Sequence, residues 1–300
     1  MAAVWRRHVG RNINRVYIRI LTSHNANAVR DEANPKTAWK NRRDRVKALL
    51  LKIDADIICL QELRILDITP ETWLAEFTDY RFDIVYCNAT KLGFARAILY
   101  KLDKLMPVDR TCIWLSDSPD SPSDFVDSQG KQGYGSVLQG IHFLRVHDGK
   151  VDPNSPIRVY NAHLGMDELV KTQSCALLAA FGDRTRPRIL AGDFNFFADK
   201  DGRSQYETLA KNWDNLAIGR ITSQSGLAIQ GTFVGYEADA FKASQPVNFG
   251  VLDHIFTCGF EGSDARVHTE TMLQVEPNEL TERDSLPSDH LPLSVIVEEL

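Results

Sequence analysis

The 300-residue chain lacks any apolar run that approaches the roughly 20 residues needed for a helix to cross a membrane. We therefore expect no transmembrane segment. It also lacks internal repeats, low-complexity tracts and linker-like changes in composition. This composition predicts a single globular domain over residues 15–300, preceded by a basic extension over residues 1–14.

Cysteine is sparse in this chain. The five cysteines are widely spread, and none forms a CxxC pair. An odd number at such spacing favours reduced thiols over a disulfide framework or a zinc site. We expect an intracellular protein, most simply a cytoplasmic one. Residues 1–30 contain six arginines and no acidic residue, a bias typical of either a mitochondrial leader or a disordered basic terminus.

A net positive charge is absent as well, because the formal charge is −5. Proteins that hold nucleic acid through phosphate contacts alone usually carry a basic surface. The densest basic run, over residues 40–47, falls on a predicted helix whose apolar stripe includes Val46, Leu49 and Ile53. We interpret this run as a solvated helix face, with phosphate steering as the alternative.

Short segments rich in β-branched and aromatic residues predict strands over residues 15–21, 56–60, 82–87, 97–101, 137–146, 157–164, 188–192, 251–256 and 291–297. Amphipathic periodicity predicts helices over residues 39–53, about 70–78, 168–181 and 203–211. Many strands with few helices predict an α+β fold in which two sheets pack face to face and the helices lie outside.

Residues 116–135 form the region richest in turn-forming residues, since Pro, Ser, Asp and Gly cluster between two apolar segments. Its glycines are not followed by the GK[ST] pattern of a phosphate-binding loop. We therefore expect a long surface loop there, near the substrate.

Polar or ionisable residues stand at or beside the ends of several predicted strands. Taken singly, a strand-end Asp or Asn is commonly a turn former or a helix cap, and a lone His is commonly a satisfied structural residue. Taken together they predict a site, because loops at strand ends are where a rigid scaffold carries its functional groups. The residues are Asn25, Glu62, His163, Asp193, Asn195, Asp253, Asp289 and His290.

Four of these residues are carboxylates: Glu62, Asp193, Asp253 and Asp289. If they converge, like charges about 4 Å apart would repel by roughly 4 kcal/mol per pair at an effective dielectric of about 20. A positive partner would offset this repulsion. Carboxylate and carboxamide oxygens without a Cys or His cluster select Mg²⁺ or Mn²⁺ rather than zinc. Asp193 would then be a base or a metal-side carboxylate, and Asn195 would donate hydrogen bonds to a charged substrate oxygen.

Short motifs occur in order along most of the chain: SHN, LQEL, GFARAILYK, NAHLG, GDFN, LDHIF and PSDHLPL. In this order they resemble the motifs of the endonuclease/exonuclease/phosphatase superfamily of metal-dependent phosphoesterases. The resemblance implies a four-layer α/β/β/α sandwich of the DNase I-like type, with two mixed β-sheets between helices and the catalytic groups on one edge.

The resemblance also implies a metal centre. Glu62 resembles the principal Mg²⁺ ligand of the family. Asn25 and Asp289 resemble supporting or second-site ligands. Mn²⁺ is the expected substitute for Mg²⁺.

The remaining roles follow from the same resemblance. His290 is similar to the histidine that contacts the scissile phosphate, with Asp253 accepting its other N–H. Asp193 resembles the residue that activates or orients the attacking water, and Asn195 resembles the one that steadies the developing charge. His163 stands where many members have a phosphate-contacting or acid histidine. The implied reaction is a one-step in-line attack of water on phosphorus, without a covalent intermediate.

Three features of the sequence help to distinguish between subfamilies of the superfamily. The segment NFGVLDHIF lacks the WCDR pattern of inositol polyphosphate 5-phosphatases, and His163 stands where abasic-site endonucleases tend to have tyrosine. The segment IWLSDSP resembles the generic metal-dependent hydrolase branch.

The leading interpretation is a monomeric, Mg²⁺-dependent phosphodiesterase of nuclease type, with nucleic acid as the candidate substrate. One alternative is a phosphoesterase for a small-molecule or lipid-linked phosphate. Another is a catalytically silent binding module, although such modules typically lose a metal carboxylate or the terminal His, both of which this chain keeps. For either substrate class we expect aromatic residues at the rim of the site, namely Trp73, Phe77, Phe94 and Tyr134.

Overall fold

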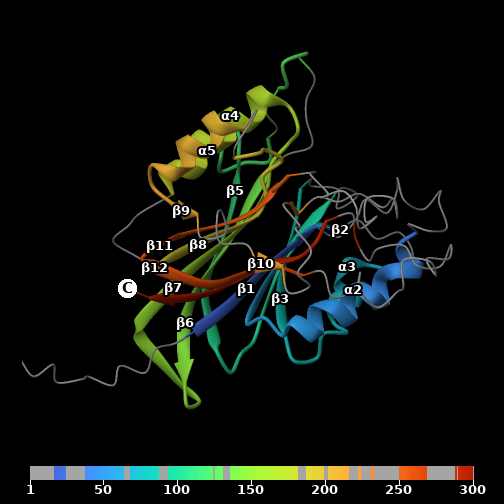
Figure 1. Cartoon of the computed structure of the whole chain (residues 1–300), viewed down its shortest axis with the longest axis vertical. Helices are drawn as coiled ribbons and strands as arrows, with labels where there is room; N and C mark the ends of the chain where they lie inside the picture. The colour runs from blue at the N-terminus through green and yellow to red at the C-terminus, as the bar shows by residue number, and fades with distance from the viewer. Residues whose placement is uncertain are drawn as a thin grey trace, which may run out of the picture.

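Two β-sheets pack face to face in the structure, a computed structural model, and helices lie outside each sheet (Figure 1). This is the predicted α/β/β/α sandwich of the α+β class. No helix in the described part of the chain is both long and apolar enough to span a bilayer. The structure describes residues 17–24, 38–63, 68–87, 94–123, 126–130, 136–181, 187–198, 202–215, 222–223, 231–232, 250–268, 288 and 290–299.

Both sheets are mixed, because β1 pairs in parallel with β2, and β7 with β8, while most other neighbours are antiparallel. Among the described residues, the larger sheet has seven strands, in the order β10 (Thr222–Ser223), β12 (Phe260–Val267), β13 (Leu293–Glu299), β1 (Tyr17–His24), β2 (Ile57–Leu63), β4 (Ala95–Tyr100) and β3 (Arg81–Tyr86). The smaller has six, in the order β5 (Leu105–Trp114), β6 (Val137–His147), β7 (Lys150–His163), β8 (Arg188–Asp193), β11 (Asp253–Cys258) and β9 (Asp214–Asn215).

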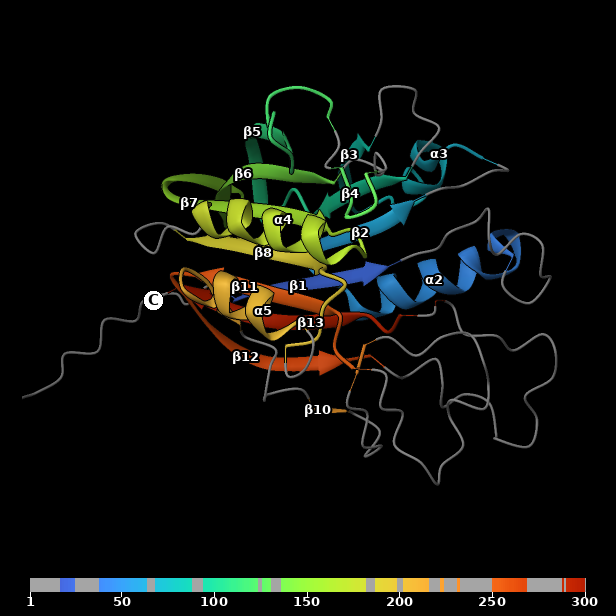
Figure 2. The same ribbon diagram turned by 90° about the horizontal axis from the view of Figure 1, so that it is seen from above.

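In the described part of the chain, two pairs of helices form the outer layers. Helices α4 (Glu168–Ala180) and α5 (Arg203–Ala210) lie over the six-stranded sheet (Figure 2). Helices α2 (Trp39–Ile53) and α3 (Pro70–Leu74) cover the seven-stranded sheet. Helix α2 has the predicted bounds and ends where Asp54 adopts a left-handed conformation and its N–H reaches back to the Leu50 carbonyl.

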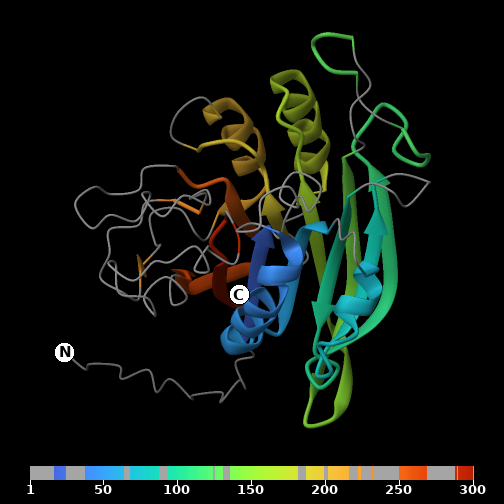
Figure 3. The same cartoon turned by 90° about the vertical axis from the view of Figure 1, so that its right-hand side faces the viewer.

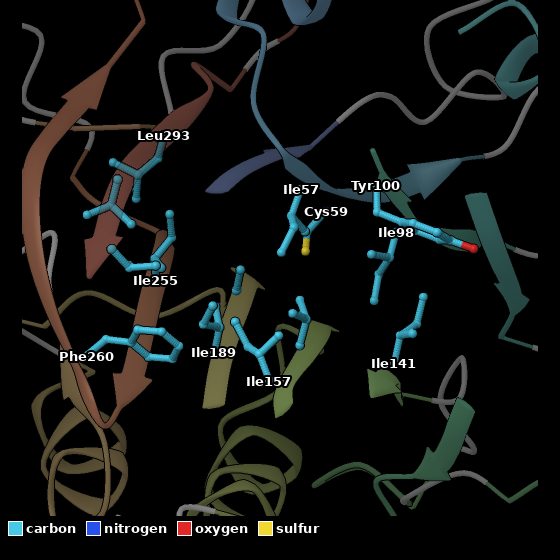
Figure 4. Packing of buried hydrophobic residues seen from close by; sticks show 14 of the residues in the cluster. Ile57, Cys59, Ile98, Tyr100, Ile141, Ile157, Ile189, Ile255, Phe260 and Leu293 are labelled. Carbon is cyan, nitrogen blue, oxygen red and sulfur yellow. The ribbon is translucent and has the colours of Figure 1, made fainter. Parts of the chain in front are cut away.

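Side-chain alternation along the strands separates the layers. On β2, Ile57 and Cys59 face the opposite sheet, whereas Ile58 and Leu60 pack against the helices. Figure 4 shows side chains from both sheets meeting in the inter-sheet core. Each fully buried aliphatic side chain contributes about 1.5–3 kcal/mol relative to exposure. The fold is therefore held chiefly by this core and by two smaller cores beneath the helices.

The β6–β7 hairpin projects from the end of its sheet (Figure 3). Its turn consists of Asp148 and Gly149, whose φ values of 49° and 74° are those of a primed two-residue turn. The sequence predicted both strands, but it did not predict β5, β9, β10 or β12. Strand β5 escapes prediction because it is an edge strand that contains Pro107 and leaves Met106 and Val108 exposed.

The prediction of rim aromatics is wrong for two of the four residues. Trp73 and Phe77 are buried in the core beneath α2, where the Trp73 ring lies 5.0 Å from Trp39 and 5.1 Å from Phe77. Burial of these large apolar rings is favoured by the hydrophobic effect, and their edge-to-face contacts stabilise them in the core. Phe94 is half-buried, and Tyr134 lies outside the described residues.

The described parts of the region over residues 116–135 contain turns and no regular strand or helix, as the prediction of a loop requires. Ser128 ties this loop to the start of α4, because its hydroxyl donates to Asp167 Oδ2 at 2.6 Å. Asp167 also caps α4 by accepting from the N–H groups of Leu169 and Val170.

Candidate active site

Three of the predicted site residues form one row across three adjacent strands. In the β7/β8 ladder His163 pairs with Asp193, and in the β8/β11 ladder Asp193 pairs with Asp253. Cross-strand partners point to the same face of a sheet. Along β8 that face is the inter-sheet face, since Ile189 and Ala191 alternate with period two ahead of Asp193. The polar row therefore begins where the apolar inter-sheet core ends.

Carboxylates and imidazoles alternate through the cluster. Glu62 Oε1 lies 4.0 Å from His163 Nε2, and that nitrogen lies 3.6 Å from Asp193 Oδ2. The same Asp193 oxygen lies 4.0 Å from His290 Nε2. On its other side, His290 Nδ1 lies 2.8 Å from Asp253 Oδ2. An imidazole thus stands between successive carboxylates, and whenever it is protonated it offsets their mutual repulsion.

His290 and Asp253 form the tightest contact of the cluster, and both side chains are buried. Donation from His290 Nδ1–H to Asp253 fixes the ring and leaves Nε2 directed toward Asp193. Thr232 supports this pair: its hydroxyl oxygen accepts from the Asp253 N–H at 3.1 Å, and its carbonyl accepts from the Leu291 N–H at 2.7 Å. Nothing in the sequence pattern indicated this role for Thr232.

The turn after β8 explains why a carboxylate and a carboxamide stand two residues apart. The Asn195 N–H donates to Asp193 Oδ1 at 2.9 Å, so the second oxygen of Asp193 faces the imidazoles. Asn195 has a φ of 51°, a left-handed conformation that Asn tolerates better than most residues. Its amide Nδ2 donates to the Leu164 carbonyl at 2.7 Å and lies 3.2 Å from His163 Nε2. The amide that we expected to donate to a substrate oxygen is therefore held beside His163.

Gly192 allows β7 and β8 to approach closely at this point. A Cβ atom on Gly192 would lie 1.9 Å from the Ala162 carbonyl oxygen, which no side chain can accommodate. Beyond it, Phe194 and Phe196 are buried on either side of Asn195 and anchor the turn in the core beneath α4 and α5. The GDFN motif thus combines a close-packing glycine, two polar side chains and an apolar anchor.

His254 is a buried histidine next to the site that has a structural role. Its ring stacks on Phe196 with centroids 5.2 Å apart, and Asn215 Nδ2 lies 3.1 Å from its Nδ1. Burial lowers the pKa of His254 to about 4. The ring is therefore neutral near pH 7, where Asn215 Nδ2 donates to Nδ1 and Nε2–H faces the Phe196 carbonyl.

Two buried cations support the site, and sequence reasoning assigned neither of them a role. Lys171 on α4 donates from Nζ to the Asn195 carbonyl at 2.9 Å and pairs with Glu168 at 2.5 Å. Arg96 on β4 donates from Nη2 to the His163 carbonyl at 2.8 Å. Arg96 falls within an otherwise buried run on β4, whereas Lys171 lies on the buried face of α4, three and four residues before Ser174 and Cys175. A charged residue at a buried position of this kind was the signal in the sequence that could have identified each of them.

The donor set fits a hard divalent cation. Glu62 and Asp193 supply carboxylate oxygens to the cluster, while Asn25 and Asp289, the other two expected ligands or partners, lie outside the described residues. Within the described ranges, no group of three His, Cys, Asp or Glu side chains could by itself hold a metal ion. Mg²⁺ usually retains waters and is bound through one or two carboxylates plus substrate phosphate, so it does not require such a cage.

Two packed β-sheets flanked by helices place the chain in the DNase I-like fold class, and its carboxylates, imidazoles and carboxamide cluster at the ends of neighbouring strands. The chain belongs to the endonuclease/exonuclease/phosphatase family, whose sequence model matches residues 22–290. Members of this family are hydrolases that act on phosphate esters, and they generally use divalent metal ions.

Known proteins resemble the chain along most of its length. An uncharacterised protein of Acanthamoeba polyphaga mimivirus is 26% identical over 268 residues, which is 87% of this chain and 92% of that protein. An endonuclease/exonuclease/phosphatase family protein from Bacteroides thetaiotaomicron has a TM-score of 0.73 at 21% identity, covering 95% of this chain and 99% of its own. A mannosyl-6-phosphatase from the same organism has a TM-score of 0.69 at 22% identity, covering 93% and 99%. At these identities, the likeness to the two solved structures shows the fold alone.

Proposed function

We propose that the chain is a Mg²⁺-dependent phosphodiesterase of nuclease type, which hydrolyses its substrate by in-line attack of water. The observation that carries the proposal is the unbroken series of contacts of 4.0 Å or less from Glu62 through His163, Asp193 and His290 to Asp253. Such a cluster combines a metal ligand, a base and an electrophilic donor, the groups that this reaction needs.

Glu62 would hold the ion, with Asp193 beside it, and Asn25 and Asp289 are the further ligands proposed. A bound Mg²⁺, or Mn²⁺ in its place, would supply charge neutralisation and Lewis-acid polarisation of the phosphate. The half-buried carboxylate of Glu62 suits this role, because it remains accessible at the edge of the sandwich.

Asp193 would accept a proton from the attacking water or orient it. Its Oδ1 accepts from the Asn195 N–H, and its Oδ2, which faces His163 and His290, would receive the water's hydrogen. Asp193 Oδ2 lies 3.6 Å from His163 Nε2 and 4.0 Å from His290 Nε2, which puts that oxygen in the middle of the cluster.

His290 would donate from Nε2–H to a phosphate oxygen, and the negative charge of Asp253 would stabilise a positive charge on its ring. On the opposite side of Asp193, Asn195 Nδ2 lies 3.2 Å from His163 Nε2. These two groups would stabilise the charge that develops on phosphorus oxygens in the transition state. Preorganised donors of this kind cost little reorganisation at the moment of reaction.

A substrate panel tests the proposal. Supercoiled plasmid, bis(4-nitrophenyl) phosphate, 4-nitrophenyl phosphate and a phosphocholine lipid would each be incubated with Mg²⁺, Mn²⁺ or a chelator. We expect plasmid nicking and diester cleavage that require the metal and stop on chelation. The absence of metal-dependent hydrolysis across the panel would instead favour a catalytically silent binding module.

A small-molecule phosphate ester is the second candidate substrate. Two observations favour it: the formal charge of −5 opposes a polyanionic substrate, and a protein with this fold is described as a mannosyl-6-phosphatase. Faster turnover of the monoester than of the diester in the same panel would select this candidate over the nuclease.

A further inference from the structure

The β2 strand is interrupted immediately before it reaches the site. Its antiparallel ladder with β4 pairs Leu60 with Ala97 and then resumes with Leu63 and Ala95, which leaves two residues of β2 in a bulge. Glu62 lies in this bulge with a φ of 51°. Non-glycine residues rarely adopt this left-handed conformation, and it persists only where the surrounding structure enforces it.

The bulge decides where the Glu62 side chain lies. In a regular strand Glu62 would share the face of Ile58 and Leu60, both of which pack against the helices outside the sheet. Instead its carboxylate lies 4.0 Å from His163 Nε2, a residue of the opposite sheet. The contact between Glu62 and the remainder of the cluster therefore depends on the irregular backbone.

Asn161 binds both carbonyls at the start of the bulge from the other sheet. It lies on β7, two residues before His163, and its side chain is fully buried. Its Nδ2 donates at 3.0 Å to the Leu60 carbonyl and at 3.0 Å to the Ala97 carbonyl. These carbonyls belong to the last regular pair before the ladder breaks. One amide thus donates to a carbonyl on each strand of this pair.

Gln61 completes the connection. Its Nε2 donates to Asn161 Oδ1 at 2.7 Å and to the Cys59 carbonyl at 3.1 Å, and its side chain is fully buried. Asn161 therefore contacts the backbone before the bulge and the side chain of its first residue. These bonds are made in the dry inter-sheet region, where an unmade hydrogen bond is most costly.

We propose that Asn161 is a positioning residue for Glu62. It holds the bulge of β2 in the conformation that turns the Glu62 carboxylate toward His163, and thereby sets the affinity of the site for its divalent cation. The inference rests on the proposed function, because it takes Glu62 as a metal ligand. It goes further in assigning the metal affinity to an amide that contributes no ligand.

Two asparagine variants provide the test. Asn161→Leu removes the amide at similar volume, and Asn212→Leu is the matched control, because Asn212 Nδ2 donates to the Ala179 carbonyl between α5 and α4. Mn²⁺ binding without substrate would be measured by calorimetric titration, and amide hydrogen exchange would be followed over residues 57–63. We expect Asn161→Leu to weaken Mn²⁺ binding by about 10- to 100-fold and to accelerate exchange at Glu62 and Leu63. The control should match the wild type in both measurements.

Wild-type Mn²⁺ affinity and wild-type exchange in folded Asn161→Leu would overturn the inference. If the wild type itself neither binds Mn²⁺ nor hydrolyses any ester, the proposed function fails, and hydrogen exchange still decides whether Asn161 holds the bulge. If Asn161→Leu does not fold, Gln61→Leu replaces it, since this change removes one of the bonds to Asn161 and keeps the others. We then expect about fivefold weaker Mn²⁺ binding, and unchanged affinity and exchange would refute the proposal.

Discussion

The two sheets deliver their residues to the site in different ways. The six-stranded sheet places His163, Asp193 and Asp253 in one row through continuous ladders of backbone hydrogen bonds. The seven-stranded sheet delivers Glu62 through a bulge, and Asn161 of the opposite sheet donates to the Leu60 carbonyl beside that bulge. A ladder distributes the work of positioning over many bonds, whereas a bulge concentrates it in a few. Substitutions in the row should therefore change the chemistry, and substitutions around Glu62 and Asn195 should change the geometry.

The largest effect is expected at the centre of the row. Asp193→Asn keeps the side-chain shape and leaves the β8 ladder intact, but it removes the proposed base. We expect kcat/KM for a phosphodiester to fall by about 10³-fold, with an unchanged circular dichroism spectrum. Retention of more than a tenth of the wild-type activity would show that Asp193 does not act on the attacking water.

Asp253→Asn weakens the contact between strand β11 and His290, but it leaves the β8/β11 ladder intact. The amide would keep its place in the row but would not hold the imidazolium or its tautomer as a carboxylate does. We expect a loss of roughly 10²-fold in kcat/KM with little change in KM. Thr257→Val, on the same strand and also buried, is the control, and equal losses in the two variants would contradict the role given to Asp253.

His254 should make the free energy of unfolding depend on pH. Its folded-state pKa of about 4 lies below the ordinary 6.5, so between these values the unfolded chain binds a proton that the folded chain does not. The contribution of His254 to the free energy of unfolding is therefore fully present above pH 6.5, and it is lost progressively as the pH falls toward 4. At pH 5 the loss amounts to about 2 kcal/mol. Urea unfolding at pH 7.5 and pH 5 would measure it, and His254→Leu should remove this part of the pH dependence.

The smallest effect is expected at Lys171, which holds the Asn195 carbonyl from α4. Lys171→Met keeps the aliphatic stem but removes the charged donor, so we expect a loss of about 1.5 kcal/mol in stability and a fewfold reduction in kcat. Lys47→Met, which breaks the surface pair with Glu76, is the control and should cost less than about 1 kcal/mol. Equal effects of the two substitutions on kcat would show that Lys171 does not position Asn195.

Much of the fold could be predicted because its signals are local. The apolar runs ending at Gly192 and Phe256 identify β8 and β11, and the stripe from Val46 to Ile53 identifies α2. Local signals were also misleading. The aromatic side chains of Trp73 and Phe77 suggested the rim of a binding site, but both pack into the core. Edge strand β5 carries too weak an alternation to be recognised.

The sequence by itself determined which groups are available to the site, since Glu62, His163, Asp193, Asn195, Asp253 and His290 stand at the ends of apolar segments. Only the tertiary structure decided that Asp193 pairs in register with both His163 and Asp253, and that Asn161 reaches across to the bulge beside Glu62. The reason is physical. Burial favours any register that keeps one face apolar, but hydrogen bonds between residues 64 to 101 positions apart form only when particular strands become neighbours.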